Sequence, residues 1–297
     1  MYPIKGTFID EITYDIPSQN WSFENWSKDL DNMQKVGIDT VIFVRGFFSS
    51  KAIFPTKLLD NSDNVKDLLG YILNECDKRN MKVYVGLYMK NLTWDYGDSD
   101  NEIKMNNIFI DEILEKYSFH KSFVGFYIPH EVGSNCLNIC DIYYNVSKMC
   151  KEKAKDKKVL ISPFFLTEVL VPKNEALSID QICKEWDDIF TKAGKYIDYC
   201  AFQDGSAPID NMEEHFKNIK KVCDKHNIEL WGNIEMMGRG KPTFEPIDID
   251  LLTKKIELVK PYVSNMITFE FSHFLSPQAD IKSARTLYNK YQEYYKD

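Results

Sequence analysis

The stretch FVGFYIPHE, residues 123–131, joins a continuous apolar run to a carboxylate, and the amphipathic segment 138–155 follows it. Short apolar runs of this kind are typical of parallel strands that are covered by helices. Glu131 comes directly after the run, and a carboxylate at the end of a buried strand needs solvent, a counter-charge or a substrate. The stretch therefore predicts a strand–helix unit whose strand ends at a polar site.

The same unit recurs along the whole chain. Other apolar runs lie at residues 6–12, 40–48, 82–89, 158–166, 198–205, 229–237 and 266–274, and an amphipathic segment follows each of them. Eight consecutive units of this size predict a (β/α)8 TIM barrel, and no break in composition divides residues 1–297 into separate domains. A doubly wound open sheet is the alternative fold, but the GxGxxG expected after its first strand is missing.

Composition limits the possible partners. The net charge of −8 arises from well-mixed acids and bases, without the basic stripe that a nucleic-acid partner requires. Seven scattered cysteines predict free thiols rather than a disulfide framework. Because no signal-like N-terminus and no apolar run of 18 residues is present, we expect no membrane span, and a cytoplasmic protein unless a leader has been removed. The oligomeric state stays open.

Polar residues stand where the predicted strands end, and barrels of this kind build their sites at these ends. The residues at the ends are Asp10, Glu11, Arg45, His130, Glu131, Gln203, Asp204, Asn233, Glu235, Glu270 and His273. In the last strand we expect Ile267, Phe269 and Phe271 to face the helices. The same alternation predicts that the side chains facing the barrel axis are Arg45, Glu131, Gln203, Trp231, Asn233, Glu235, Thr268 and Glu270.

Several inward acids at one barrel mouth suit the cleavage of a glycosidic bond, which needs one protonated and one ionised carboxyl group. The aromatic residues that could stack on sugar faces are Tyr88, Trp94, Tyr96, Tyr127 and Trp231. Metal-dependent chemistry fits less well because the five histidines are dispersed. Lys90 is the only candidate for a Schiff-base lysine. The loop MGRGKP, residues 237–242, is predicted to be a mobile loop over the substrate.

The positions of Glu131 and Glu235 resemble those of the clan of retaining (β/α)8 glycoside hydrolases. In that clan the acid/base follows strand four and the nucleophile ends strand seven, which implies these roles for Glu131 and Glu235. Arg45 resembles the arginine that such enzymes often hold near the nucleophile. Two positions depart from the clan: His130 stands where it usually has Asn, and Glu270 where it commonly has Trp.

The runs GTFIDE, YIPHE, FQDG, WGNIE and ITFEFSHFLSP resemble more closely a bacterial barrel family, domain of unknown function 4434, which is regarded as glycoside-hydrolase-like. The resemblance covers nearly the whole chain and implies a fold and a carbohydrate substrate, but no particular sugar. The site positions that it implies are Glu131, Gln203, Asp204, Glu235 and Glu270.

From the sequence we predict a single barrel that hydrolyses an oligosaccharide or glycoside with retention of configuration, without metal or cofactor. Arg45 and Asn233 are expected to hold the nucleophile or the sugar 2-hydroxyl. The residues expected to bind sugar hydroxyls are His130, Gln203, Asp204 and Glu270. Two alternatives remain open: a carbohydrate-binding barrel without catalysis, and an inverting hydrolase in which Glu270 replaces Glu235 as the base.

Overall fold

Eight parallel strands form a closed barrel in the computed structural model of the chain, which describes all residues except 14–15, 17, 61–63, 92–97, 239–244 and 297. The barrel strands are β1 (Gly6–Ile9), β2 (Thr40–Phe43), β5 (Lys82–Gly86), β7 (Phe123–Ile128), β8 (Lys158–Ile161), β9 (Tyr199–Gln203), β10 (Glu229–Glu235) and β11 (Asn265–Phe269). Each strand pairs with the barrel strand of the next unit, and β11 closes on β1. The predicted (β/α)8 barrel is confirmed.

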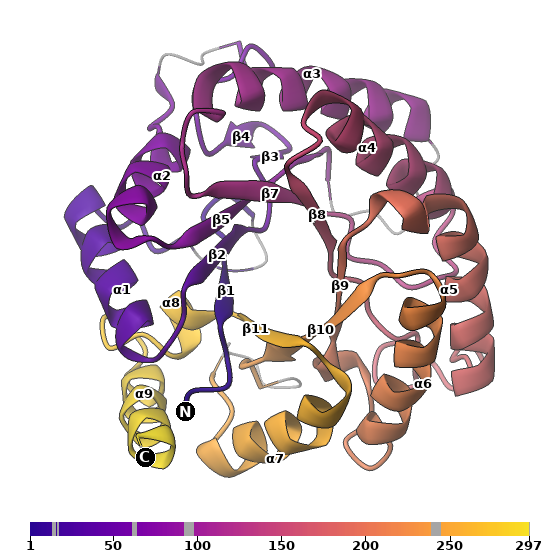
Figure 1. Cartoon of the computed structure of the whole chain (residues 1–297). Helices are drawn as coiled ribbons and strands as arrows, with labels where there is room; N and C mark the ends of the chain where they lie inside the picture. Colours follow the sequence, from indigo (N-terminus) through magenta and orange to yellow (C-terminus); the bar gives the residue numbers. More distant parts are fainter. Residues whose placement is uncertain (14–15, 17, 61–63, 92–97, 239–244, 297) are drawn as a thin grey trace.

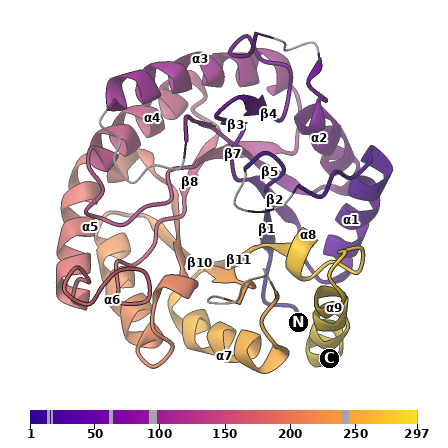
Figure 2. The same ribbon diagram turned by 180° about the vertical axis from the view of Figure 1, so that it is seen from behind.

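Helices surround the barrel on all sides, as Figures 1 and 2 show from opposite directions. They are α1 (Phe23–Lys35), α2 (Leu68–Arg79), α3 (Ser99–Tyr117), α4 (Ile139–Lys153), α5 (Ile179–Ala193), α6 (Met212–Lys225), α7 (Ile249–Val259), α8 (Phe271–Phe274) and α9 (Lys282–Tyr295). Ser22 and Ser178 begin α1 and α5 with reciprocal side-chain caps. No helix in the described part of the chain is long and apolar enough to cross a membrane.

The barrel interior is an apolar core of its own, separate from the core between strands and helices. The buried residues of the inner core are Phe8, Ile42, Val44, Tyr84, Tyr127, Leu160, Ala201, Trp231 and Ile267. Side chains of this kind fill the interior of (β/α)8 barrels in layers. The interior is therefore packed, and polar chemistry is confined to the strand ends.

The predicted orientation of the last strand is wrong. Ile267 belongs to the inner core and pairs in register with Asn233, so both side chains face the axis. Thr268 faces away from the axis, where its hydroxyl donates to the backbone oxygen of Ile234. The prediction failed because it assigned apolar residues to the helix side, whereas the barrel interior is equally apolar.

In three of the predicted strands the chain turns into another regular element before the predicted end. Residues 40–48 and 82–89 leave the barrel after β2 and β5, and form a separate small sheet of β3 (Phe47–Phe48), β4 (Lys51–Ala52) and β6 (Tyr88–Met89). After β11 the chain turns into α8, and the side chain of Glu270 caps that helix by accepting a hydrogen bond from the backbone of His273. Apolar periodicity does not detect these turns because the residues stay buried through them.

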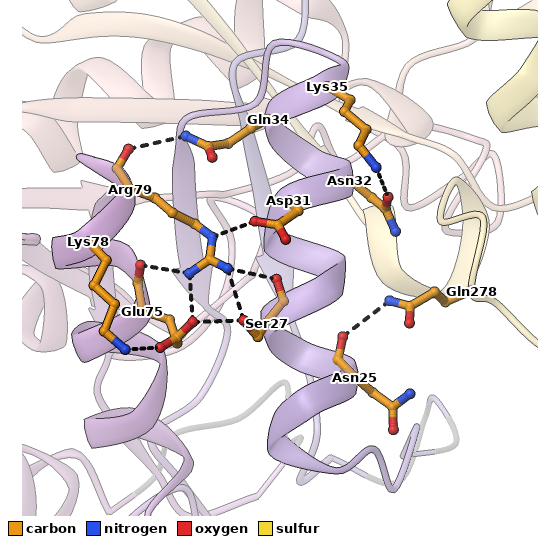
Figure 3. Close-up of polar contacts among 10 residues, drawn as sticks. All are labelled: Asn25, Ser27, Asp31, Asn32, Gln34, Lys35, Glu75, Lys78, Arg79 and Gln278. Carbon is orange, nitrogen blue, oxygen red and sulfur yellow. Dashed lines mark hydrogen bonds and ion pairs between the residues drawn. The ribbon is translucent and has the colours of Figure 1, made fainter.

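Polar contacts hold α1 against α2 and against the chain that precedes α9 (Figure 3). Arg79 on α2 contacts Asp31 at 2.8 Å and Glu75 at 2.6 Å, and Glu75 also accepts a hydrogen bond from Ser27 at 2.7 Å. Although burial acts in the opposite direction, the bonds from Lys78, Ser27 and Arg79 lower the pKa of Glu75 to about 2. Near the other end of the chain, Gln278 donates to the backbone oxygen of Asn25.

Candidate active site

Glu131 follows β7 and lies against a buried arginine. The guanidinium of Arg45 is 3.4 Å from Glu131 Oε2 and 3.2 Å from Asp10 Oδ2. Arg45 also donates to the hydroxyl of Thr13 at 3.0 Å. Because only 3% of the Arg45 side chain is exposed, its charge requires these partners. The ends of β1, β2 and β7 thus share one ion-paired cluster, which favours the ionised form of Glu131.

Tyr127 supports Glu131 from inside the barrel. Its ring is fully buried, with its centroid 5.1 Å from that of Phe8, and its hydroxyl donates to Glu131 Oε1 at 2.6 Å. Burial, together with the neighbouring Glu131 charge, holds the pKa of Tyr127 well above its usual value. Tyr127 therefore acts as a hydrogen-bond donor to Glu131, and its buried ring offers no platform for a sugar.

Glu235 ends β10 on another part of the mouth, beside a second buried ion pair. Its backbone N–H donates to Asp204 Oδ1 at 2.9 Å. Lys255 on α7 places its ammonium 3.0 Å from Asp204 Oδ2 and 2.6 Å from the backbone oxygen of Glu235. Burial raises the pKa of Asp204 to about 6; Lys255 opposes this shift, and the Glu235 charge adds to it.

The carboxyl group of Glu235 lies over Gly205, which follows Asp204 at the end of β9. A Cβ atom on residue 205 would stand 2.0 Å from Glu235 Oε2. Only glycine leaves this space open, so residue 205 determines where the carboxyl group can lie.

Asn233 and Gln203 form the polar floor between these clusters. Asn233 donates to Ser162 Oγ at 3.1 Å, and Gln203 donates to the Ser162 backbone oxygen at 2.9 Å. Among the described residues, Asn233 Oδ1 is buried without a hydrogen-bond partner. Both residues face the axis as predicted.

Several predicted site residues lie elsewhere. His130 is fully buried, with Nε2 3.1 Å from Glu102 on α3, so it packs behind Glu131 instead of lining the mouth. Glu270 is also fully buried and contacts His273 next to α8. Both depart from the expectation that they bind sugar hydroxyls.

The predicted aromatic platforms are mostly structural. Trp231 is buried and stacks on Tyr199 at 4.4 Å, four residues before the end of β10 and so roughly 13 Å below Glu235. Tyr88 is 6% exposed and stacks on Phe47. Trp94 and Tyr96 lie outside the described residues, as does most of the predicted loop 237–242. No described aromatic side chain from the prediction faces the mouth as a platform.

Arg45 is paired differently from the prediction. The sequence predicts that it holds the nucleophile, assigned there to Glu235, or the sugar 2-hydroxyl, whereas the structure places it against Glu131 and Asp10. Sequence patterns gave no indication of Lys255, Thr13 and Ser162. Lys255 lies inside an amphipathic helix and Ser162 just after a strand, so neither carries a signal that separates it from an ordinary polar residue.

No group of three or more histidine, cysteine, aspartate or glutamate side chains that could hold a metal ion occurs among the described residues. The groups that the structure brings together at the mouth are carboxylates, two cations, one phenol and amides. This arrangement can transfer protons and can stabilise positive or negative charge next to a bound molecule.

A protein family described as domain of unknown function DUF4434 matches residues 4–281. The chain belongs to the DUF4434 family. The resemblance seen in the sequence is thereby confirmed. No curated protein matches this DUF4434 chain.

Solved structures extend the comparison. The DUF4434 chain is 37% identical to a protein of Bacteroides thetaiotaomicron VPI-5482 described as a "putative alpha-L-fucosidase", with a TM-score of 0.94 over 99% of this chain and 94% of that one. A GH18 chitinase from Pseudoalteromonas aurantia matches with a TM-score of 0.59 and 10% identity, covering 97% and 99% of the two chains. The PgaB glycoside hydrolase domain of Bordetella bronchiseptica matches with a TM-score of 0.57 and 10% identity, covering 98% of each. The last two similarities concern the fold alone.

Proposed function

We propose that this chain is a glycoside hydrolase that cleaves a glycosidic bond with retention of configuration, using Glu131 and Glu235 as its two carboxyl groups. The observation that carries the proposal is that Glu131 follows β7 and Glu235 ends β10, three strands apart around one barrel mouth, each beside a buried cation–aspartate pair. Two carboxyl groups on either side of one sugar ring are what this chemistry requires. Its substrate is an oligosaccharide or another glycoside.

The roles of the two glutamates can be distributed in two ways. Their strand positions resemble the clan in which Glu131 would be the acid/base and Glu235 the nucleophile. The contacts favour the reverse distribution, because Arg45 and Tyr127 both stabilise the carboxylate form of Glu131. An ionised group is ready to attack the sugar carbon, whereas a proton donor must be neutral at the start. We therefore favour Glu131 as nucleophile and Glu235 as acid/base.

The alternatives have less support. In an inverting hydrolase Glu270 would serve as the base, yet it is fully buried and caps α8. A carbohydrate-binding barrel without catalysis would not need the two buried cations next to Glu131 and Glu235.

The test begins with a panel of p-nitrophenyl glycosides that includes the α-L-fucoside, because of the similarity to the Bacteroides protein. For any glycoside that is cleaved, Glu131→Gln and Glu235→Gln should each lower kcat by about a thousandfold. Glu115→Gln, an exposed residue on α3, is the matched control and should keep full activity. Proton NMR of the first product should show the substrate's own anomeric configuration.

Azide distinguishes the two role assignments. With Glu235→Ala and an activated substrate, azide should yield a glycosyl azide of retained configuration if Glu235 is the acid/base, and of inverted configuration if it is the nucleophile. Glu131→Ala should give the opposite result. Full activity of both glutamine variants on a glycoside that the wild type cleaves would contradict the proposal.

A further inference from the structure

A large groove opens beside Glu235 on the same face of the barrel. It has a volume of about 900 Å³, and its described lining residues lie just after β9, next to the end of β10 and on α6, α7 and α9. Asp204, Gly205 and Glu235 line one part of it, so the groove is continuous with one half of the candidate active site.

The lining of this groove is mainly apolar, with the polar side chains of Lys282, Ser283, Thr286 and Lys290 along α9. Its main apolar side chains are Ile209, Met212, Met237, Ile247, Leu251 and Leu287. None of its described lining residues is aromatic, although the chain contains 41 Phe, Tyr and Trp residues in total (19, 17 and 5). The aliphatic part of the groove offers no ring on which a sugar could stack, and the donors of the lining stand to one side of it on α9, so this part suits hydrocarbon better than sugar.

Part of this apolar surface is exposed. Leu251 is 38% exposed and Val169 41% exposed, and both line the groove. Exposed apolar surface that adjoins a polar site is a common mark of a binding groove. The surroundings of Glu131 differ, because there Arg45, Asp10 and Thr13 present charged and hydroxyl groups.

We propose that this groove is the leaving-group subsite, and that the natural substrate is a glycoside whose aglycone is an apolar aliphatic alcohol. The inference rests on the proposed function and deepens it by naming the substrate class. The sugar lies toward the polar Arg45 side, and the aglycone extends past Glu235 into the groove.

Glu131 and Glu235 together account for every bond and proton in the proposed cleavage. Glu131 forms a bond to the anomeric carbon as the bond to the aglycone oxygen breaks, and that oxygen takes the proton of Glu235. The alcohol then leaves through the groove. Water attacks the same carbon, its proton returns to Glu235, and the bond to Glu131 breaks.

Matched n-octyl and methyl glycosides test the inference, each carrying the sugar that the p-nitrophenyl panel identifies and each used below micelle-forming concentrations. We expect kcat/KM to be at least tenfold higher for the octyl glycoside, because the groove takes up several methylene groups. Leu251→Glu places a charge in the groove at the third residue of α7, where glutamate suits a helix start, and should reduce this ratio to below about threefold. Ile108→Glu, another exposed apolar position, on α3, is the control and should leave the ratio unchanged.

The outcomes separate the two proposals. Equal kcat/KM for the octyl and methyl forms, or an octyl preference that Leu251→Glu leaves intact, overturns the aglycone subsite while hydrolysis itself stands. If no glycoside of the panel is cleaved and isothermal titration calorimetry shows no preference for octyl over methyl forms, both proposals fall. If calorimetry shows that preference without cleavage, the groove binds hydrocarbon but the hydrolase and leaving-group assignments fall.

Discussion

On one side of the barrel mouth the buried cation Arg45 reaches the carboxylate of Glu131, whereas on the other side Lys255 reaches the backbone oxygen of Glu235. Each cation also pairs with a buried aspartate, Asp10 or Asp204. The two sides thus contain the same kinds of group, but the cation contacts the side chain of one glutamate and the backbone of the other. A balance of charges alone therefore does not assign a catalytic role, because the role depends on which atom of the glutamate the cation contacts.

The largest expected effect comes from removing each cation. Arg45→Met should lower kcat/KM by about 100- to 1000-fold, since it removes the charge that faces Glu131. Lys255→Met should lower it by only about tenfold, because Lys255 contacts Glu235 through the backbone. Steady-state kinetics on one activated glycoside checks both, and urea unfolding shows how far each loss of a buried partner destabilises the fold. Equal losses of activity would contradict the view that the two cations act differently on the two glutamates.

Next in size is the effect of a methyl group beside each glutamate. Gly205→Ala should lower kcat about 10- to 100-fold with little change in melting temperature, because the new Cβ displaces the flexible carboxyl group of Glu235. Gly133→Ala, two residues after Glu131, is the matched control, since its Cβ would meet Phe164 at a milder 3.2 Å. A Gly205→Ala enzyme with wild-type kinetics would show that the position of Glu235 is not critical.

The pH dependence of stability should also differ between the two sides. Because the pKa of Asp204 is raised by burial to about 6, the folded state holds a proton there that the unfolded chain loses near pH 4. The stability from this group is therefore complete below pH 4 and declines by up to about 3 kcal/mol as the pH rises to 6. Urea unfolding of Asp204→Asn between pH 4 and 7 should lack this decline, while Asp10→Asn should keep it.

The smallest effect concerns one hydroxyl. Tyr127→Phe should lower kcat/KM about tenfold by removing the hydrogen bond to Glu131. Tyr143→Phe is the matched control, because that buried hydroxyl donates to the backbone oxygen of His130. A larger loss for the Tyr143 variant would mean that the backbone under Glu131 matters more than its charge.

The sequence revealed Glu131 and Glu235 as a pair because each ends an apolar run, and in a barrel all such ends meet on one face. It could not place His130 and Glu270, since residues next to a strand end can turn either way. His130 turns toward Glu102 on α3, and Glu270 caps α8. The orientation of His130 depends on a contact with a residue far away in the chain. The orientation of Glu270 depends on the short helix that follows β11.

The repeating strand–helix units, the barrel and the strand-end carboxylates can be read from the sequence, because hydrophobic periodicity is local and eight units of this length close in one way. The contacts of Arg45 with Glu131 and of Lys255 with Asp204, and the mainly apolar groove beside Glu235, become visible in the folded chain alone. These contacts join residues on different units of the barrel. Their energies depend on distance and burial in space, which spacing along the chain does not contain.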